Sequence, residues 1–249
     1  MTGLAIEWRP SPNHTERRGR ARVEILVLHY TNMTSAEATL ERLCDPKVEA
    51  SAHYLVREDG HIWQLVAEHR RAWQAGVACW RGERDVNSHS IGIEIAHPGH
   101  IWGYRPFPPA QVAAVLQLSQ GIVARHGIEA RNVVAHSDIA PDRKEDPGEL
   151  FPWAAFARAG VGLWPRDGAL TAAPRTVPPL VAVQAALARF GYEIEANGSF
   201  DLATRNAILA FQRHFRPQRL DGVFDSQCAA ILEDLLRQSD CAADEGFLG

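Results

Sequence analysis

The chain is poor in cysteine and methionine, and it has no hydrophobic run long enough to cross a membrane. Its 249 residues include 4 cysteines and 2 methionines. No two cysteines are spaced as Cys-x-x-Cys, so neither a zinc finger nor a thioredoxin-like redox motif is expected. The first thirty residues contain no basic segment followed by an apolar one, which is the pattern of a secretory leader. We therefore expect reduced thiols and no transmembrane helix.

An excess of positive charge is also missing. The 26 lysines and arginines are outnumbered by 30 acidic residues, which gives a net charge of −4. Surfaces that bind nucleic acid are basic, so a nucleic-acid partner is not expected. Hydrophobic residues make up 46% of the chain, as in ordinary globular proteins. The 11 histidines, in contrast, are more than packing requires.

Strand and helix patterns alternate through the first two thirds of the chain. The near-continuous apolar runs at 23–29, 91–96 and 132–135 predict buried strands. The periodicity at 108–126 predicts an amphipathic helix that ends at Gly127. The pair Asp59-Gly60 lies between two β-rich runs and predicts a hairpin. These elements indicate an α/β fold, and residues 1–22 are expected to form an extended arm before it.

The composition changes near residue 165. Residues 165–179 contain four prolines among small and polar residues, which is typical of a linker. Beyond it, helices are expected at 180–190, 201–215 and 225–237. The sequence therefore predicts a first domain over 1–164, a linker over 165–179 and a small all-α domain over 180–240.

Histidines follow two of the predicted core strands. His29 ends the first strand, and His136 follows the run at 132–135. Residues 136–148 then form a charged stretch in which Pro141 and Pro147 exclude a continuous helix. Imidazole and carboxylate groups are good ligands for zinc, although a catalytic zinc site needs a third ligand and an open position. The alternative is a solvated charged loop beside one strand-end histidine.

Glu94 lies between two isoleucines of a predicted core strand. Its side chain can face solvent or pair with an arginine. Alternatively, it can point into a site, where partial burial would raise its pKa and suit it to act as a general base.

Several stretches, in the right order, resemble the zinc-dependent N-acetylmuramoyl-L-alanine amidases of the type-2 class, which are related to peptidoglycan recognition proteins. They cover most of residues 20–150, and the last of them is the most specific. The matching stretches are 28–31 (Leu-His-Tyr-Thr), 51–54 (Ser-Ala-His-Tyr), 72–76 (Ala-Trp-Gln-Ala-Gly), 90–94 (Ser-Ile-Gly-Ile-Glu) and 136–148 (His-Ser-Asp-Ile-Ala-Pro-Asp-Arg-Lys-Glu-Asp-Pro-Gly).

The resemblance implies a central mixed β-sheet flanked by helices and one Zn²⁺ per chain. It implies that His29, His136 and Asp146 are the zinc ligands. It also implies that Glu94 acts on the attacking water and that Lys144 assists the oxyanion. The expected substrate-binding residues are Tyr30, His53, Trp73, Asn87 and His97.

Two positions depart from the family pattern. Gln74 stands where the family often has histidine, and Asp142 replaces a common glycine. Glutamine keeps hydrogen-bonding capacity but does not titrate, which leaves substrate contacts at that position open. Asp142 is expected to face solvent.

The segment at 180–238 resembles the three-helix peptidoglycan-binding domain, and the matching positions are 183–187 (Val-Gln-Ala-Ala-Leu), 190–192 (Phe-Gly-Tyr), Gly198-x-Phe200, Thr204, Phe211-Gln212 and Asp221-Gly222. Within it, the pattern Gly-x-Phe-Asp occurs twice, at 198–201 and 222–225. A plain helical scaffold or dimerisation domain is the alternative.

Together the resemblances imply hydrolysis of the amide between the lactyl group of N-acetylmuramic acid and L-alanine of the stem peptide. Peptidoglycan or soluble anhydromuropeptides would be the partners, with anhydromuropeptides favoured. A non-catalytic peptidoglycan-recognition protein is the alternative. We expect a cytoplasmic protein, with an envelope enzyme or a phage lysin released at lysis as alternatives.

Overall fold

The computed structural model describes residues 4–19, 21–173 and 176–245. Its centre is a six-stranded sheet in the order β1-β5-β4-β7-β3-β8. All neighbouring pairs are parallel except β4 and β5, which are antiparallel, so the predicted mixed sheet is confirmed. The strands are β1 (Ile6–Trp8), β3 (Ile25–Tyr30), β4 (Tyr54–Val56), β5 (Ile62–Gln64), β7 (Ser90–Ile95) and β8 (Val133–Ala135).

The hairpin between β4 and β5 forms where Asp59-Gly60 predicts it. Gly60 has a φ of 88°, a conformation that favours glycine. The Asp59 side chain accepts a hydrogen bond from the His61 amide at 3.0 Å. The turn therefore has a local cause in the sequence.

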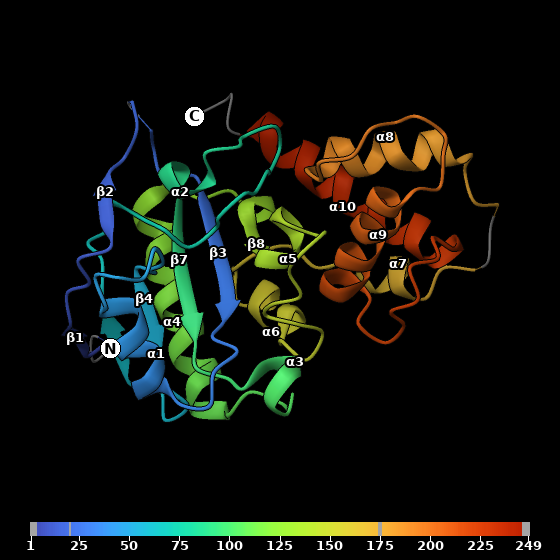
Figure 1. Ribbon diagram of the computed structural model, residues 1–249. Coiled ribbons are helices and arrows are strands. Elements are labelled where there is room, and N and C mark those ends of the chain that lie inside the picture. The colour runs from blue at the N-terminus through green and yellow to red at the C-terminus, as the bar shows by residue number, and fades with distance from the viewer. Residues whose placement is uncertain (1–3, 20, 174–175, 246–249) are drawn as a thin grey trace.

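Helix α4 (Pro109–His126) covers one face of the sheet and lies behind it in Figure 1. Its apolar side packs on β3, β4 and β7, and Gly127 ends it with a left-handed φ of 65°. Helix α1 (Ala36–Cys44) is capped by Ser35, whose side chain accepts a hydrogen bond from the Ala38 amide. The short helices of this part are α2 (Val86–His89), α3 (Gly99–Trp102), η1 (Ala130–Asn132), α5 (His136–Ile139) and α6 (Trp153–Arg158).

The N-terminal segment is part of the fold, so the prediction of an extended arm over 1–22 is wrong for the described residues. β1 adds to the edge of the main sheet beside β5. β2 (His14–Glu16) pairs with β6 (Arg70–Ala72) in a second, two-stranded sheet. Edge strands offer unpaired backbone groups, and these N-terminal strands satisfy them.

Three longer helices follow: α8 (Leu180–Phe190), α9 (Leu202–Phe215) and α10 (Ser226–Glu245). We call them the C-terminal helices. The two Gly-x-Phe-Asp turns are built alike, since each glycine amide donates to a buried glutamine of the preceding helix. Gly198 donates to Gln184 at 2.8 Å, and Gly222 donates to Gln212 at 2.9 Å.

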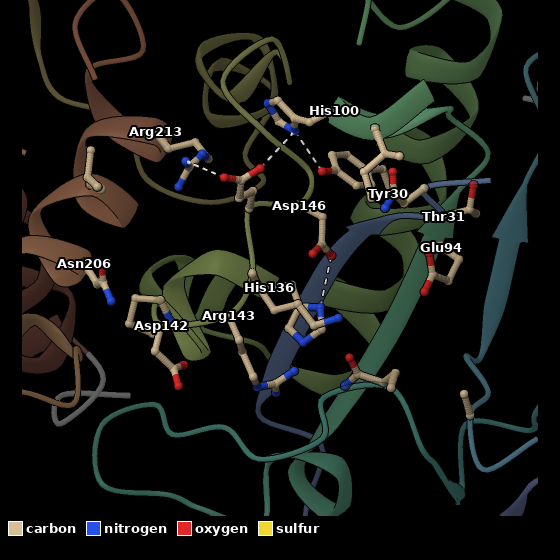
Figure 2. Close-up of a pocket in the computed structure, with 18 of the residues that line it drawn as sticks. Tyr30, Thr31, Glu94, His100, His136, Asp142, Arg143, Asp146, Asn206 and Arg213 are labelled. Atoms are coloured by element: carbon tan, nitrogen blue, oxygen red, sulfur yellow. Dashed lines mark hydrogen bonds and ion pairs between the residues drawn. The ribbon is translucent and has the colours of Figure 1, made fainter. Parts of the chain in front are cut away.

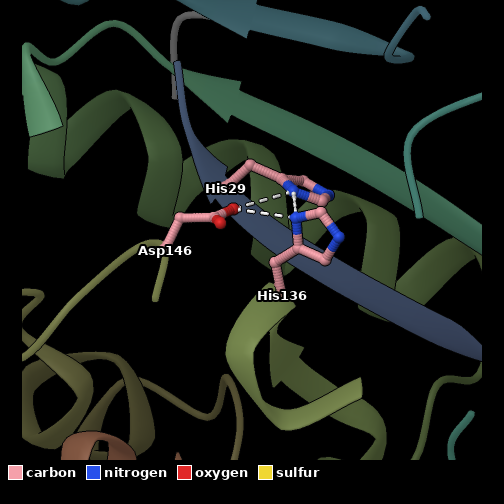
Figure 3. Close-up of side chains that lie close together, drawn as sticks. All are labelled: His29, His136 and Asp146. Atoms are coloured by element: carbon pink, nitrogen blue, oxygen red, sulfur yellow. Dashed lines mark hydrogen bonds and ion pairs between the residues drawn. The ribbon is translucent and has the colours of Figure 1, made fainter. Parts of the chain in front are cut away.

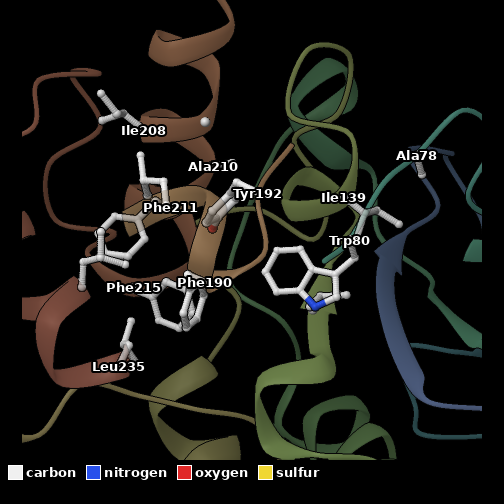
Figure 4. Close-up of a cluster of buried hydrophobic side chains, with 14 of the residues drawn as sticks. Ala78, Trp80, Ile139, Phe190, Tyr192, Ile208, Ala210, Phe211, Phe215 and Leu235 are labelled. Carbon is white, nitrogen blue, oxygen red and sulfur yellow. The ribbon is translucent and has the colours of Figure 1, made fainter. Parts of the chain in front are cut away.

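The C-terminal helices share a core with the sheet part of the chain. One hydrophobic cluster joins Val27, Trp80 and Ile139 to residues of α8, α9 and α10. Trp80 meets Phe190 and Tyr192 edge to face, with ring centroids 5.9 and 5.5 Å apart (Figure 4). Trp80 is therefore a packing residue of the core that the sheet and the C-terminal helices share.

The segment predicted as a linker contains a helix of its own, α7 (Asp167–Leu170). It packs against α10, and the Arg166 amide donates to Asp234 at 2.9 Å. Ala169 is buried and Leu170 packs on the shared core, which is why this stretch is ordered against the helices.

Candidate active site

Three side chains form a compact cluster at one end of the sheet. His29 lies on β3, and His136 begins α5 directly after β8, the parallel neighbour of β3. Asp146 comes from the loop beyond α5 and lies against both histidines (Figure 3). The two Nδ1 atoms are 2.9 Å apart, and Asp146 Oδ2 is 3.1 Å from His29 and 3.0 Å from His136. These three buried residues could hold a metal ion.

The geometry of the cluster fits a divalent metal such as zinc. Tetrahedral zinc with bonds of about 2.0–2.1 Å places its ligand atoms about 3.3 Å apart, close to the spacing here. The two Nδ1 atoms face each other, an arrangement that a shared cation satisfies when both histidines carry their protons on Nε2.

The other nitrogen of each histidine has an acceptor, which fixes the ring. His136 Nε2 donates to the Ala75 carbonyl at 3.2 Å, and His29 Nε2 donates to Gln74 Oε1. With the protons on Nε2, both Nδ1 lone pairs are free to bind a metal.

Gln74 therefore supports a candidate metal ligand, a role that the sequence did not reveal. Its side-chain amide also donates to Ser90 Oγ at 2.7 Å, which orients its oxygen toward His29. Its backbone amide donates to Asn87 Oδ1 at 3.0 Å. The motif at 72–76 was the available signal, but it left substrate contacts at Gln74 open and gave no indication of a contact with His29.

Asp146 is held as a carboxylate. Burial raises the pKa of Asp146, but the charge of His136 and the hydrogen bonds that protonated Nδ1 atoms of both histidines donate when no metal is bound hold it well below its usual range. A carboxylate is the form that binds a cation.

Glu94 lies on β7 directly opposite His29 in the strand register. Burial raises the pKa of Glu94 to about 7. Its Oε2 is shut off from solvent and has no hydrogen-bond partner among the described residues. Glu94 lines the adjoining cavity, and no arginine among the described residues pairs with it, so its carboxylate is not engaged by a salt bridge.

A cavity of about 640 Å³ opens above these residues. Tyr30, Trp73, Glu94, His136, Lys144 and Asp146 line it, together with Asp142 and Arg143 at its exposed edge. Helix α9 closes the opposite side, where Figure 2 shows Asn206 and Arg213 across from His136. The residues from α9 are Arg205, Asn206, Leu209 and Arg213.

The cavity does not include three of the residues that the resemblance assigned to substrate binding. His53 is fully buried, and its Nδ1 accepts from the Gly92 amide at 3.1 Å. His97 is 2% exposed and donates to the Arg105 carbonyl at 2.7 Å. Asn87 orients the chain at Gln74 and Ala75 through two backbone amides. All three are engaged in supporting contacts within the fold.

Tyr30, by contrast, borders the cavity with its hydroxyl 2.8 Å from His100 Nδ1. Burial raises the pKa of Tyr30 to about 12, so its hydroxyl stays protonated at neutral pH. Trp73 also borders the cavity, as expected.

Comparison with known proteins agrees with this geometry. The family model described as N-acetylmuramoyl-L-alanine amidase matches residues 19–149, and one described as a peptidoglycan binding domain matches 176–232. The N-acetylmuramoyl-L-alanine amidase AmiD of Escherichia coli (strain K12) is 40% identical over 90% of this chain and 87% of its own. The 1,6-anhydro-N-acetylmuramyl-L-alanine amidase AmpD of the same organism is 32% identical over 59% of this chain and 87% of its own.

Two solved structures are similar over nearly the whole chain. AmiD from E. coli, in complex with anhydro-N-acetylmuramic acid-L-Ala-D-gamma-Glu-L-Lys, has a TM-score of 0.78 and 37% identity and covers 91% of this chain and 98% of its own. AmpDh3 from Pseudomonas aeruginosa has a TM-score of 0.80 and 33% identity and covers 93% of this chain and 96% of its own. The chain therefore belongs to the N-acetylmuramoyl-L-alanine amidase family.

Proposed function

We propose that the chain is a zinc-dependent amidase that cleaves the bond between the lactyl group of N-acetylmuramic acid and L-alanine of the stem peptide. The single observation that carries the proposal is the grouping of His29, His136 and Asp146 beside the unpartnered carboxylate of Glu94 in one cavity. Soluble anhydromuropeptides are the favoured substrates, because AmiD and AmpDh3 were solved with such molecules.

The residues of the cavity have complementary roles in this reaction. His29, His136 and Asp146 would hold the zinc ion, which supplies polarisation of a water molecule and of the scissile carbonyl. Glu94 accepts the proton that the water loses and donates it to the departing alanine amine. Lys144, which has no ion-pair partner among the described residues, stabilises the negative charge that develops on the carbonyl oxygen.

Substrate contacts are assigned to the residues that border the cavity. Tyr30 and Trp73 provide aromatic surface for the sugar or the first peptide residues. His53, Asn87 and His97 act instead by supporting the cavity wall.

The remaining finer assignments are also proposals. The division into an amidase domain over 1–164 and a peptidoglycan-binding domain over 180–240 is supported by the ranges of the two family matches. No helix in the described part of the chain is long and apolar enough to span a membrane. A cytoplasmic site of action, our expectation, is distinguished from an envelope location by fractionating cells that produce the native protein.

Mass spectrometry of products from a soluble 1,6-anhydro-N-acetylmuramoyl peptide tests the reaction. Free stem peptide should form, should disappear after treatment with a chelator and should return with added zinc. A zinc-loaded protein that releases no peptide from this substrate or from intact sacculi would favour the non-catalytic recognition protein instead.

A further inference from the structure

Helix α9 contacts both ends of the loop that carries two of the proposed zinc ligands. We call residues 136–149 the metal loop, since His136 begins it and Asp146 lies near its end. Two consecutive residues of α9, Arg213 and His214, reach these two ends separately. The contacts join segments that lie more than sixty residues apart in sequence.

The first contact is at Asp138, two residues after His136. Asp138 is 1% exposed, and its carboxyl group accepts three hydrogen bonds. One comes from the Ala135 amide at 2.8 Å and fixes the single turn of α5. The other two come from the C-terminal helices and the turn after α8, from His214 Nδ1 at 2.6 Å and the Tyr192 hydroxyl at 2.8 Å.

The packing around this contact leaves little freedom. The His214 ring lies between Trp153 and Phe215, with centroids 3.8 and 3.9 Å away and nearly parallel planes. Tyr192 is 2% exposed and stands edge to face against Trp80. Groups this well enclosed hold Asp138, and with it the start of α5, in one position.

The second contact is at the other end of the metal loop, beside Asp146. The Arg213 guanidinium lies 3.9 Å from Glu145 and 3.7 Å from Glu149, and its side chain is 13% exposed. The same two glutamates pair with His100, whose Nδ1 is 2.8 Å from the Tyr30 hydroxyl. Figure 2 shows this chain of groups, from Arg213 on α9 to Tyr30 on β3. The glutamates on either side of Asp146 in the sequence, Glu145 and Glu149, are thus both paired with Arg213 of α9.

We propose that Tyr192, Arg213 and His214 are positioning residues that hold His136 and Asp146 at ligand distance from His29. This inference rests on the proposed function for the identity of the metal, and it assigns the C-terminal helices a direct part in the metal site. These three residues act through Asp138, Glu145 and Glu149 and do not touch the metal.

The test compares two variants of the full-length chain with matched controls. Tyr192→Phe removes one hydroxyl from Asp138, and Tyr54→Phe removes the hydroxyl of another buried tyrosine, which donates to Glu68 at 2.7 Å, away from the cavity. Arg213→Met removes the guanidinium at the loop, and Arg219→Met removes one that pairs with Asp221 and Asp225 at the surface.

Zinc affinity is measured by competition with a chromophoric chelator, and ligand geometry by the visible absorption of the cobalt(II)-substituted protein. Supporting hydrogen bonds around metal sites are worth about 10–100-fold in affinity or activity, and we expect about 10-fold weaker zinc binding in Tyr192→Phe and Arg213→Met. Their cobalt spectra should change, and kcat should fall with little change in KM. The controls should match the wild type in all three measurements.

Two variants of His214 test whether zinc binding can be lost and then recovered at one position. His214→Leu should weaken zinc binding in the same way, and His214→Asn, which keeps a side-chain N–H facing Asp138, should recover much of it. Thermal unfolding of the metal-free proteins is recorded alongside, so that a general loss of stability is seen separately.

Unchanged zinc affinity and an unchanged cobalt spectrum in Tyr192→Phe and Arg213→Met would overturn the proposal, whatever their stability. A higher KM for Arg213→Met with normal zinc binding would overturn it for Arg213 and make that residue a substrate contact. Failure of the proposed amidase function is distinguishable, since the wild type would then release no peptide while the metal measurements still report on positioning.

Discussion

Glu94 is a partly buried residue, and its buried oxygen Oε2 has no hydrogen-bond partner among the described residues. A buried polar group without a partner is costly, and such groups are found where a ligand or water is to be bound. In the metal-free chain, burial also raises the pKa of the Glu94 carboxyl group to about 7. Both features suit a group that must take up a proton and release it again.

Glu94→Gln keeps the size of the side chain and removes its basicity. We expect kcat to fall at least ~10²-fold, the usual scale for loss of a general base. Release of free peptide, followed by mass spectrometry, measures the rate, and zinc affinity should stay near that of the wild type. A variant that cleaves at the wild-type rate would contradict the assigned role.

His53 leads to a prediction about stability and pH. Burial, followed by the nearby charge of Arg17, lowers the pKa of His53 from 6.5 to about 3. The unfolded chain therefore takes up a proton below pH 6.5, which the folded chain resists until about pH 3. The contribution of His53 to the free energy of unfolding is therefore full above pH 6.5. As the pH drops from 6.5 towards 3, this contribution decreases by up to about 1.4 kcal/mol per pH unit.

Urea unfolding of the metal-free protein between pH 7 and pH 4.5 measures this slope. His53→Asn should be less stable at pH 7 but should lose less stability on acidification than the wild type. Parallel slopes for the two proteins would show that another group is responsible.

At the scale of single elements, a helix or strand could be predicted from the sequence when local residues form it, and could not when it depends on a contact with a distant part of the chain. α4 follows its hydrophobic period and ends at Gly127, and the Asp59-Gly60 hairpin follows its turn residues, so both were predictable. The single turn of α5 was not, because two of the three hydrogen bonds that hold Asp138 come from His214 and Tyr192, far along the chain. The N-terminal strands β1 and β2 were not predicted for the same reason, because they pair with β5 and β6, which come much later in the chain.

Alanine substitutions at two glycines with positive φ separate the effect of backbone strain from the effect of a distorted metal loop. Gly127 has a φ of 65° and open space around it, whereas a Cβ at Gly148, with a φ of 86°, would overlap the Tyr104 hydroxyl. That hydroxyl donates to the Pro147 carbonyl and accepts from the Leu150 amide, on either side of Gly148.

Gly127→Ala should cost about 1 kcal/mol of unfolding free energy, the scale of a left-handed conformation for alanine. Zinc affinity should not change. Gly148→Ala should weaken zinc binding as well, because the displaced Tyr104 shifts the loop next to Asp146. Chelator competition and urea unfolding of both variants check this, and equal zinc affinity in the two would contradict it.

At the scale of the whole molecule, the family motifs identify the candidate ligands but not the full cavity. His29, Glu94, His136 and Asp146 were recognisable from short stretches and their order. The wall formed by Arg205, Asn206 and Arg213 was not, because nothing in the period of α9 tells which of its faces docks on another part of the chain. The shared core around Trp80 was not predicted either, because its partners Phe190 and Tyr192 lie far along the chain.

This shared core predicts one cooperative unfolding event. Trp80 contacts Phe190 and Tyr192, so unfolding of the C-terminal helices exposes the core beside the sheet. Differential scanning calorimetry of the zinc-loaded chain should show a single transition, with calorimetric and van't Hoff enthalpies in agreement. Two resolved transitions would mean that the two parts unfold independently.

The hold of α9 on the metal loop also bears on the order of events during synthesis. A chain leaves the ribosome from its N-terminus, so the loop at 136–149 emerges well before Arg213 and His214. Until those residues follow, Asp138 lacks two of its three donors, and the carboxylates beside Asp146 lack their cation. We therefore expect a nascent or truncated chain that lacks Arg213 and His214 to bind the proposed zinc ion more weakly, so that amidase activity develops only after α9 has been synthesised.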